Sequence, residues 1–246
     1  MAALRDPSMS ASNPQIPRSF SRRSVVRHRR VRPAGKEVTA RRAKELIGEQ
    51  EVIEVAVEGI DARQIESFNK EYSASPANFR LGLEARAIWE GRGLGNLGKV
   101  GRWSLGGQVM EKPTRDFSVQ LGSWKEVGDA LGVEGADDRI EPVETALVGL
   151  SSCVTEAIIL NCARKGISPE AVEVKARVEV DPGPITGAKD PSDWDKTLKS
   201  VDVDVTVRGD ITDRDKTVIE EGAKRSPVNY LFGKTGLLNT KFHYKK

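Results

Sequence analysis

The chain has 246 residues, 38% of them hydrophobic and 30% charged, and its formal net charge is +3. This length and apolar content allow one large domain, or one domain with an extension, around a packed core. Two cysteines, the lack of a hydrophobic leader and the lack of a lipid-spanning stretch argue against a secreted or membrane protein. We therefore expect a protein of a reducing compartment, the cytoplasm first, with no membrane partner.

Residues 1–37 are rich in Ser, Pro and Arg and have almost no apolar periodicity, which predicts a tail that cannot bury enough surface to order itself. Seven arginines crowd into residues 18–32, and such an arm favours an anionic partner, either RNA or an acidic protein. A solvated tail is the plain alternative. The composition also resembles an organellar transit peptide, so a mitochondrial or other organelle matrix is the second expected location.

Residues 38–76 are predicted to be a helical N-terminal extension. A helix at 39–47 begins with a capping threonine, a short strand is expected within 52–60, and a second helix at 61–74. The segment Ser73-Ala-Ser-Pro76 then interrupts the chain, which leaves residues 77–246 as the main domain.

Alternation of apolar and polar residues predicts the strands that open this domain. Residues 79–87 form a strand with one buried face, and two further strands at 100–110 and 116–121 complete an antiparallel meander. The glycine-rich segment at 89–98 is interpreted as a hairpin turn rather than a phosphate loop, because its spacing matches neither a Walker nor a dinucleotide motif.

Residues 142–166 predict the long helix around which the domain is organised. Pro142 suits the first helical position, and Gly166 is typical of a left-handed stop. The apolar residues between them fall on several faces, which indicates a helix enclosed by protein, while interspersed polar residues argue against a membrane span. Cys153 lies near its centre.

The second half of the domain contains the clearest strands. Valines alternate with charged residues at 172–180 and at 201–207, and the loop at 181–200 between them is long enough to cover a site or contact a neighbour. A helix at 212–224 and a final strand at 237–244 follow. This order predicts an α+β fold in which the long buried helix packs on an antiparallel sheet.

The run Glu144-Thr-Ala-Leu-Val-Gly-Leu-Ser-Ser-Cys153, followed by Lys165-Gly-Ile and an alternating Val strand, resembles the OsmC/Ohr family. These are the osmotically inducible protein C and organic hydroperoxide resistance proteins, and the resemblance covers residues 79–246. It implies an OsmC-like fold and an intertwined homodimer with active sites near the subunit interface. It also implies an oxidoreductase of the stress response with peroxiredoxin-like activity.

In peroxidase members of this family, one cysteine on the central helix attacks the peroxide and a second, before Pro-Val, resolves the product as a disulfide. Cys153 takes the first position, but Ser226 takes the second, so the chain resembles a divergent member that lacks the second cysteine. Cys162 cannot replace it, because nine residues along one helix separate the two cysteines by ~13 Å, beyond the ~7 Å limit for a disulfide. We expect Cys162 to be a buried apolar residue.

The family resemblance also implies an arginine from the early sheet beside the thiol. Arg92 is the best positional match, with Arg86 and Arg102 as alternatives. The family's glutamate falls one residue before Glu144, and one residue rotates a helical side chain by ~100°. Glu144 is therefore either the functional carboxylate or a residue that only stabilises the helix start. The candidate catalytic residues are Cys153, Arg92 and Glu144, with no cofactor and no metal.

The chemistry of Cys153 depends on a cation. A free thiol with a pKa of ~8.5 is mostly protonated at neutral pH, and burial raises that pKa further. With an arginine nearby, the thiolate could reduce an organic hydroperoxide and become a sulfenic acid, which an external thiol would then reduce. Two alternatives are a cysteine-nucleophile hydrolase or transferase assisted by His243, and a non-catalytic structural or binding subunit that docks through its basic arm.

Overall fold

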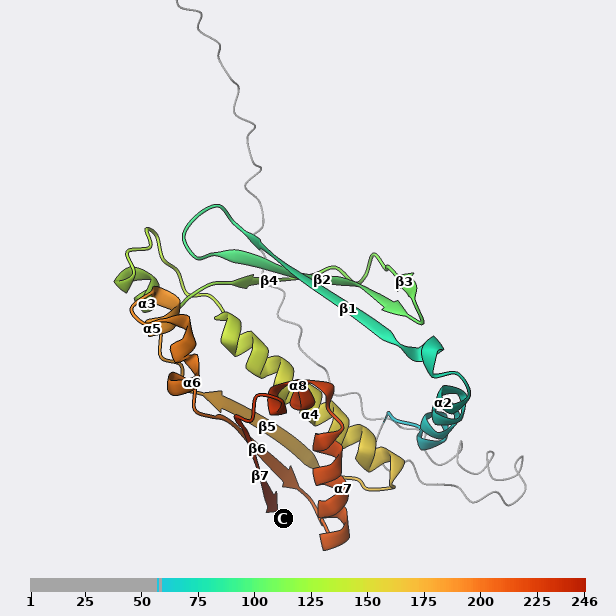
Figure 1. The fold of residues 1–246 in the computed structure, drawn as a ribbon. Coiled ribbons are helices and arrows are strands. Elements are labelled where there is room, and N and C mark those ends of the chain that lie inside the picture. Colours follow the sequence, from blue (N-terminus) through green and yellow to red (C-terminus); the bar gives the residue numbers. More distant parts are fainter. Residues whose placement is uncertain (1–56, 58) are drawn as a thin grey trace, which may run out of the picture. The chain divides into compact units, whose positions relative to one another are not determined.

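The computed structural model describes residue 57 and residues 59–246, and Figure 1 gives the order of the elements. The predictions for the tail at 1–37, for the helix at 39–47 and for most of the strand at 52–60 lie outside the described residues. At the end of that strand, Val57 and Ile60 form an isolated antiparallel bridge. The division of the chain into segments at 37 and 76 stays a prediction.

The helix predicted at 61–74 is present as α2, Ala62–Ala74, and Asp61 caps it by accepting the backbone N–H of Arg63. A short 3-10 helix, η1 (Pro76–Phe79), follows. Phe79 packs edge-on against Phe68 of α2, with ring centroids 5.0 Å apart. This aromatic contact joins the helix to the segment that leads into the first sheet.

The first sheet is organised around its longest strand, β2 (Asn96–Leu105), which pairs antiparallel with β1 (Leu81–Trp89). Two short strands also pair with β2: β3 (Gln108–Met110) at its C-terminal end and β4 (Phe117–Leu121) at its N-terminal end. The predicted meander is therefore wrong in two respects. The strand predicted at 100–110 turns back at Gly106 and Gly107, so that its second half is β3, and β4 returns to β2 instead of pairing with β3. The ten residues of β2 are long enough to hold both partners on one edge.

Several apolar side chains of the first sheet are uncovered in the single chain. Leu83 is 79% exposed and pairs across the sheet with Trp103, and Phe117 is 56% exposed and pairs with Val100. No residue of β1 is buried. The prediction of a strand with one buried face is thus wrong for the single chain, because no described element lies over that face.

The long helix is present as α4, Pro142–Arg164. Pro142 occupies the first turn, where its missing N–H costs no hydrogen bond, and Gly166 follows the helix with a φ of 72°. The helix start also has a capping box, which satisfies N–H groups that would otherwise lack partners. The predicted boundaries are confirmed.

Three strands form the second sheet. The predicted strands are present as β5 (Ala171–Val178), β6 (Val201–Arg208) and β7 (Leu238–Lys245). β5 is antiparallel to β6, whereas β7 is parallel to it, so the sheet is mixed rather than antiparallel throughout. The reason is the helical connection between β6 and β7, since parallel neighbours need a crossover. The α+β class is confirmed.

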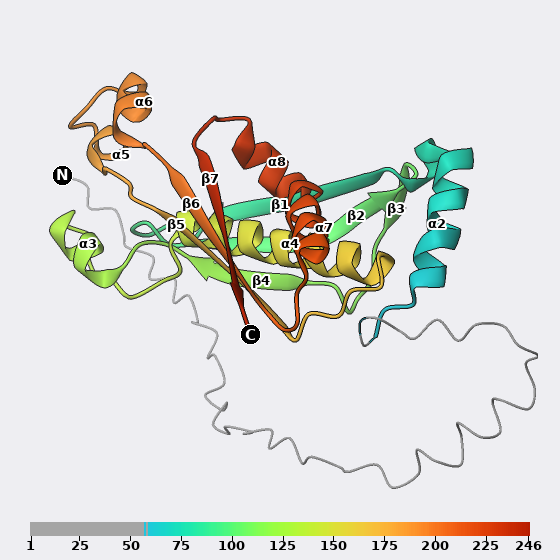
Figure 2. The same ribbon diagram turned by 90° about the horizontal axis from the view of Figure 1, so that it is seen from below.

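That crossover consists of α7 (Asp213–Lys224) and α8 (Pro227–Gly233), both of which contact α4 (Figure 2). The core joins Leu150, Val154 and Ile158 of α4 to the valines of β6 and to Ile219 of α7. Gly222 lets α7 approach closely, because a Cβ atom there would lie 2.8 Å from the Cα of Ile158.

Part of the surface of α4 is uncovered by the described chain. Val148 is 67% exposed and Leu160 is 51% exposed. The prediction of a helix enclosed on all faces is therefore wrong for the single chain, because its contacts with α2, β5, α7 and α8 leave these side chains uncovered. By length and composition alone α4 could also cross a membrane, a test that the core helix of a soluble protein passes equally.

Short helices fill the remaining connections. α3 (Lys125–Ala130) was not predicted. The loop at 181–200 contains α5 (Gly183–Thr186), η2 (Pro191–Asp193) and α6 (Trp194–Thr197), and an ion pair between Asp181 and Lys189 closes its first turn. A covering role for this loop stays a prediction.

Candidate functional site

Cys153 lies near the middle of α4 and is half-buried, between the fully buried Leu150 and Val154. At ~100° per residue, its side chain leaves the helix about 160° away from those of Ser151 and Thr155. This direction matters because Ser151 and Thr155 line the groove described next.

A groove of about 550 Å³ runs between α4 and β5. Glu144 lies in its wall, together with Leu147, Ser151, Thr155 and Val174. Cys153 does not line it, which is the result expected from the direction of its side chain.

The Glu144 carboxylate has a partner at the start of the helix. It accepts the backbone N–H of Glu141 at 3.0 Å, and the Glu141 side chain accepts the N–H of Val143 in return. This capping box occupies the carboxylate at the helix start. Of the two roles predicted for Glu144, the geometry favours stabilisation of the helix.

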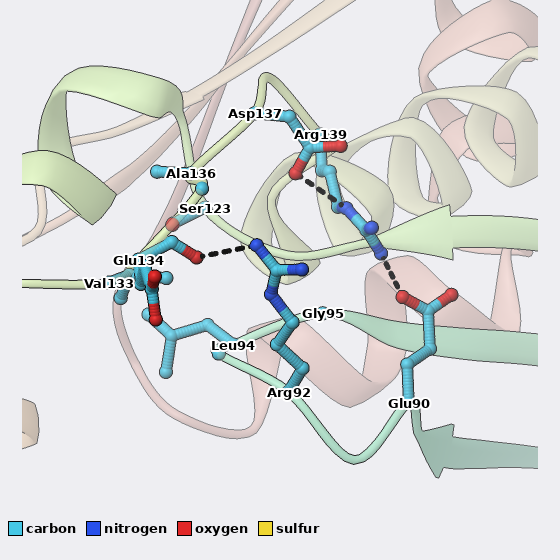
Figure 3. A pocket seen from close by; sticks show the side chains of 12 residues that line it. Glu90, Arg92, Leu94, Gly95, Ser123, Val133, Glu134, Ala136, Asp137 and Arg139 are labelled. Atoms are coloured by element: carbon cyan, nitrogen blue, oxygen red, sulfur yellow. Dashed lines mark hydrogen bonds and ion pairs between the residues drawn. The ribbon is translucent and has the colours of Figure 1, made fainter.

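Arg92 lies in the turn between β1 and β2. Its Nη2 donates to the backbone oxygen of Glu134 at 3.1 Å. The guanidinium lines a polar pocket of about 330 Å³ whose wall also includes Glu90, Ser123 and Arg139 (Figure 3). Among the ion pairs of the described residues, none involves Arg92, so its charge is available to an anion.

Arg139 is the second arginine of this pocket, and sequence reasoning missed it. Its Nη1 donates to Glu90 at 2.6 Å and its Nε to Asp137 at 3.1 Å. These hydrogen bonds, first that of Glu90 and then that of Asp137, raise the pKa of the guanidinium above its usual value. No motif marks Arg139, because its partner Glu90 is 49 residues away in the sequence.

The single chain does not bring the three predicted site residues together. Arg92 lines the polar pocket, Glu144 lines the groove on α4, and Cys153 lines neither. The alternative arginines, Arg86 on β1 and Arg102 on β2, are exposed and also line neither cavity.

Cys162 is fully buried, as predicted. Burial, and after it the negative charge of Asp215, raises the pKa of this thiol to about 11. Ser226 is also fully buried, and its hydroxyl caps α8 by accepting the N–H of Asn229 at 3.0 Å. Neither residue offers a thiolate that could resolve an oxidised Cys153.

His243 does not form a catalytic pair with Cys153 in the single chain. Its Nε2 lies 2.9 Å from a carboxylate oxygen of Asp204, and Arg177 binds the other oxygen at 2.6 Å. The neighbours of His243 along β7, Phe242 and Tyr244, pack on the core, so the imidazole lies on the opposite face of the sheet from α4. Within residues 57 and 59–246, no three His, Cys, Asp or Glu side chains gather as metal ligands would.

Comparison with family models gives a match in the second half of the chain. The model of the family described as OsmC-like protein matches residues 135–238. A search of curated proteins found no match.

Among solved structures, the chain is similar to an OsmC-like protein from Mycoplasma pneumoniae, at 12% identity and a TM-score of 0.45 over 66% of this chain and 94% of that one. It is also similar to an organic hydroperoxide resistance protein OsmC from Legionella pneumophila, at 18% identity and a TM-score of 0.40 over 67% and 96% of the two chains. A third similar structure, an organic hydroperoxide resistance protein from Elizabethkingia anophelis, has 15% identity and a TM-score of 0.43 over 68% and 96%.

Proposed function

We propose that this chain is a member of the OsmC-like protein family, whose model matches residues 135–238, and that it is a one-cysteine peroxidase that reduces organic hydroperoxides through Cys153. The observation that carries the proposal is the position of this thiol, halfway along the core helix of the matched segment and half-buried there. We propose the cytoplasm or an organelle matrix as its location, since the sulfenic acid must meet a reducing thiol.

The proposed reaction begins with the thiolate of Cys153. Its sulfur attacks the outer oxygen of the hydroperoxide, the O–O bond breaks, and the leaving alkoxide takes a proton to become an alcohol. Cys153 is then a sulfenic acid. One external thiol condenses with it to give a mixed disulfide and water, and a second thiol releases reduced Cys153 and an external disulfide. The external thiol is needed because Ser226 stands where the family's peroxidases have a second cysteine.

The thiolate needs a cation, and we propose that a second copy of the chain brings Arg92 to Cys153. In the single chain, Arg92 lines a pocket that Cys153 does not reach. The uncovered apolar residues of β1 and α4 support an intertwined homodimer, because Leu83, Trp89, Val148 and Leu160 would otherwise face water. The same dimer would cover the open side of α4.

A second candidate function is a non-catalytic binding subunit that keeps the OsmC-like fold. Two observations favour it. The carboxylate of Glu144 is part of a helix cap, and position 226 is a serine, which has no thiol. In that case the basic arm at 18–32 would be the functional element and would dock onto RNA or an acidic protein.

Peroxide oxidation of the purified full chain separates the two candidates. With cumene hydroperoxide at pH 7, the peroxidase gains one oxygen on Cys153, detected by intact mass and peptide mapping, and an added thiol removes it. Cys153→Ser abolishes the adduct, and Cys162→Ser is the matched control that retains it. An unmodified Cys153 under excess peroxide contradicts the peroxidase, and salt-sensitive RNA binding that is lost on deletion of residues 1–37 then supports the binding subunit.

A further inference from the structure

We propose that Arg139 is a positioning residue that holds the β1–β2 turn, and with it Arg92, in the geometry that the thiol chemistry requires. This inference rests on the proposed function of Cys153. The arrangement of Glu90, Arg92, Glu134, Asp137 and Arg139 is called the arginine clasp below (Figure 3). It joins two loops that are more than 40 residues apart in the sequence.

Each loop of the clasp gives one arginine to the other. Arg92, from the β1–β2 turn, donates to the backbone oxygen of Glu134 at 3.1 Å. Arg139, from the loop before α4, donates in the opposite direction to the Glu90 carboxylate at 2.6 Å. The turn is therefore held at two points, one at Arg92 itself and one two residues before it.

A glycine lies next to each of the two guanidinium groups and leaves space for it. A Cβ atom at Gly135 would lie 2.1 Å from Nη2 of Arg92, and Gly135 has a φ of 67°. Likewise, a Cβ at Gly95 would lie 2.7 Å from Nη1 of Arg139. A side chain at either position would therefore push the guanidinium away from its present position, and at Gly135 the positive φ disfavours a side chain as well.

The two arginines have different electrostatic roles. Arg139 has Glu90 and Asp137 as partners, and only 19% of its side chain is exposed, so its charge is neutralised within the clasp. Arg92 binds only a backbone oxygen in the clasp and keeps its charge for an anion. Arg139 therefore does not act on the thiolate itself, and it acts by holding Arg92.

Backbone hydrogen bonds hold Arg139 itself, between the end of β4 and the start of the helix that carries the thiol. The backbone N–H of Arg139 donates to Ser123, and the next residue, Ile140, accepts the N–H of Gly122 at 3.1 Å. Without this anchor, the turn would depend on Gly91 and Gly93, both with positive φ, which leave the backbone many conformations. A mobile turn would deliver Arg92 to the thiol only part of the time.

The test is the pH dependence of Cys153 alkylation by iodoacetamide, measured on the full chain. Arg139→Gln and Glu90→Gln each remove the anchor, so the midpoint should rise by about half to one pH unit and the rate at pH 7 should fall by about threefold to tenfold. Arg177→Gln is the matched control, because it removes an ion pair of the same length, 2.6 Å, on the outer face of the second sheet. It should leave the profile unchanged.

Arg92→Gln separates failure of this inference from failure of the proposed function. If Arg92→Gln leaves the profile of Cys153 unchanged, the proposed arginine–thiolate pair is wrong. If Arg92→Gln shifts the profile while the folded Arg139→Gln and Glu90→Gln variants do not, only the positioning role is overturned. If Arg139→Gln does not fold, the Glu90→Gln variant tests the positioning role. Glu90 is on the turn and its side chain is 33% exposed, so its substitution disturbs the fold less.

Discussion

Glu144 turns back to Glu141 and accepts its backbone N–H at 3.0 Å, although the sequence had offered this carboxylate as a catalytic group. We expect Glu144→Ala to lower the free energy of unfolding by about 0.5–2 kcal/mol, the usual cost of a lost cap. Urea denaturation measures this change. Glu156→Ala, which removes an exposed acid of the same helix, is the control, and slower peroxide reaction of Glu144→Ala at unchanged stability would contradict the capping role.

In the native protein, Cys162 should not react with an alkylating reagent that modifies Cys153. Its buried thiol has a pKa near 11, whereas the unfolded value is near 9, so almost no thiolate exists at neutral pH. We expect the native protein to take up one alkyl group at pH 8, on Cys153, and a second only after denaturation. Mass spectrometry of iodoacetamide-treated protein measures both, and rapid modification of Cys162 in the native state would disprove its burial.

The same thiol predicts how stability changes with pH. The raised pKa of Cys162 means that the folded state keeps its proton up to about pH 11, whereas the unfolded state loses it above about pH 9. The stabilisation is therefore complete below pH 9 and is lost as the pH rises through 11. We expect the unfolding free energy of the native sequence to fall more steeply over this range than that of Cys162→Ala, and parallel curves would contradict the prediction.

The contact between α7 and α4 has no room for a side chain at Gly222, where a Cβ would lie 2.8 Å from the Cα of Ile158. Gly222→Ala should lower the unfolding free energy by about 1–3 kcal/mol, because the two helices must separate to admit a methyl group. Glu221→Ala, at the exposed neighbouring position, should change it by no more than about 0.5 kcal/mol. Equal stability of both variants in thermal or urea unfolding would mean that the helices do not approach this closely.

The uncovered face of β1 predicts the oligomeric state. Leu83 is 79% exposed in the single chain, and we propose that a second copy of the chain covers it. A lysine at this position would place a charge in the proposed interface. Leu83→Lys should therefore release monomers in sedimentation experiments on a protein that is otherwise dimeric. Arg86→Gln, on the same strand, is the control and should stay dimeric, and an unchanged mass for Leu83→Lys would contradict the proposed interface.

Local patterns were sufficient to predict most elements. Pro142 and Gly166 marked both ends of α4, and the alternating valines marked β5 and β6, because capping and period-two burial depend on neighbouring residues. The pairing of the strands was harder. β7 runs parallel to β6, and β4 returns to β2. Both pairings depend on which strand edges are still unpaired after the chain has folded back.

The core helix with its central thiol, the missing second cysteine and the family resemblance, with which the match over residues 135–238 agrees, can all be predicted from the amino acids alone. The places at which the charged side chains act follow from the folded structure instead. It turned Glu144 into a helix cap, placed His243 on the far face of its sheet and brought Arg139 to Glu90 across 49 residues. The physical reason is that an ion pair needs two groups within a few ångströms, and the approach of distant loops leaves no periodic trace in the sequence.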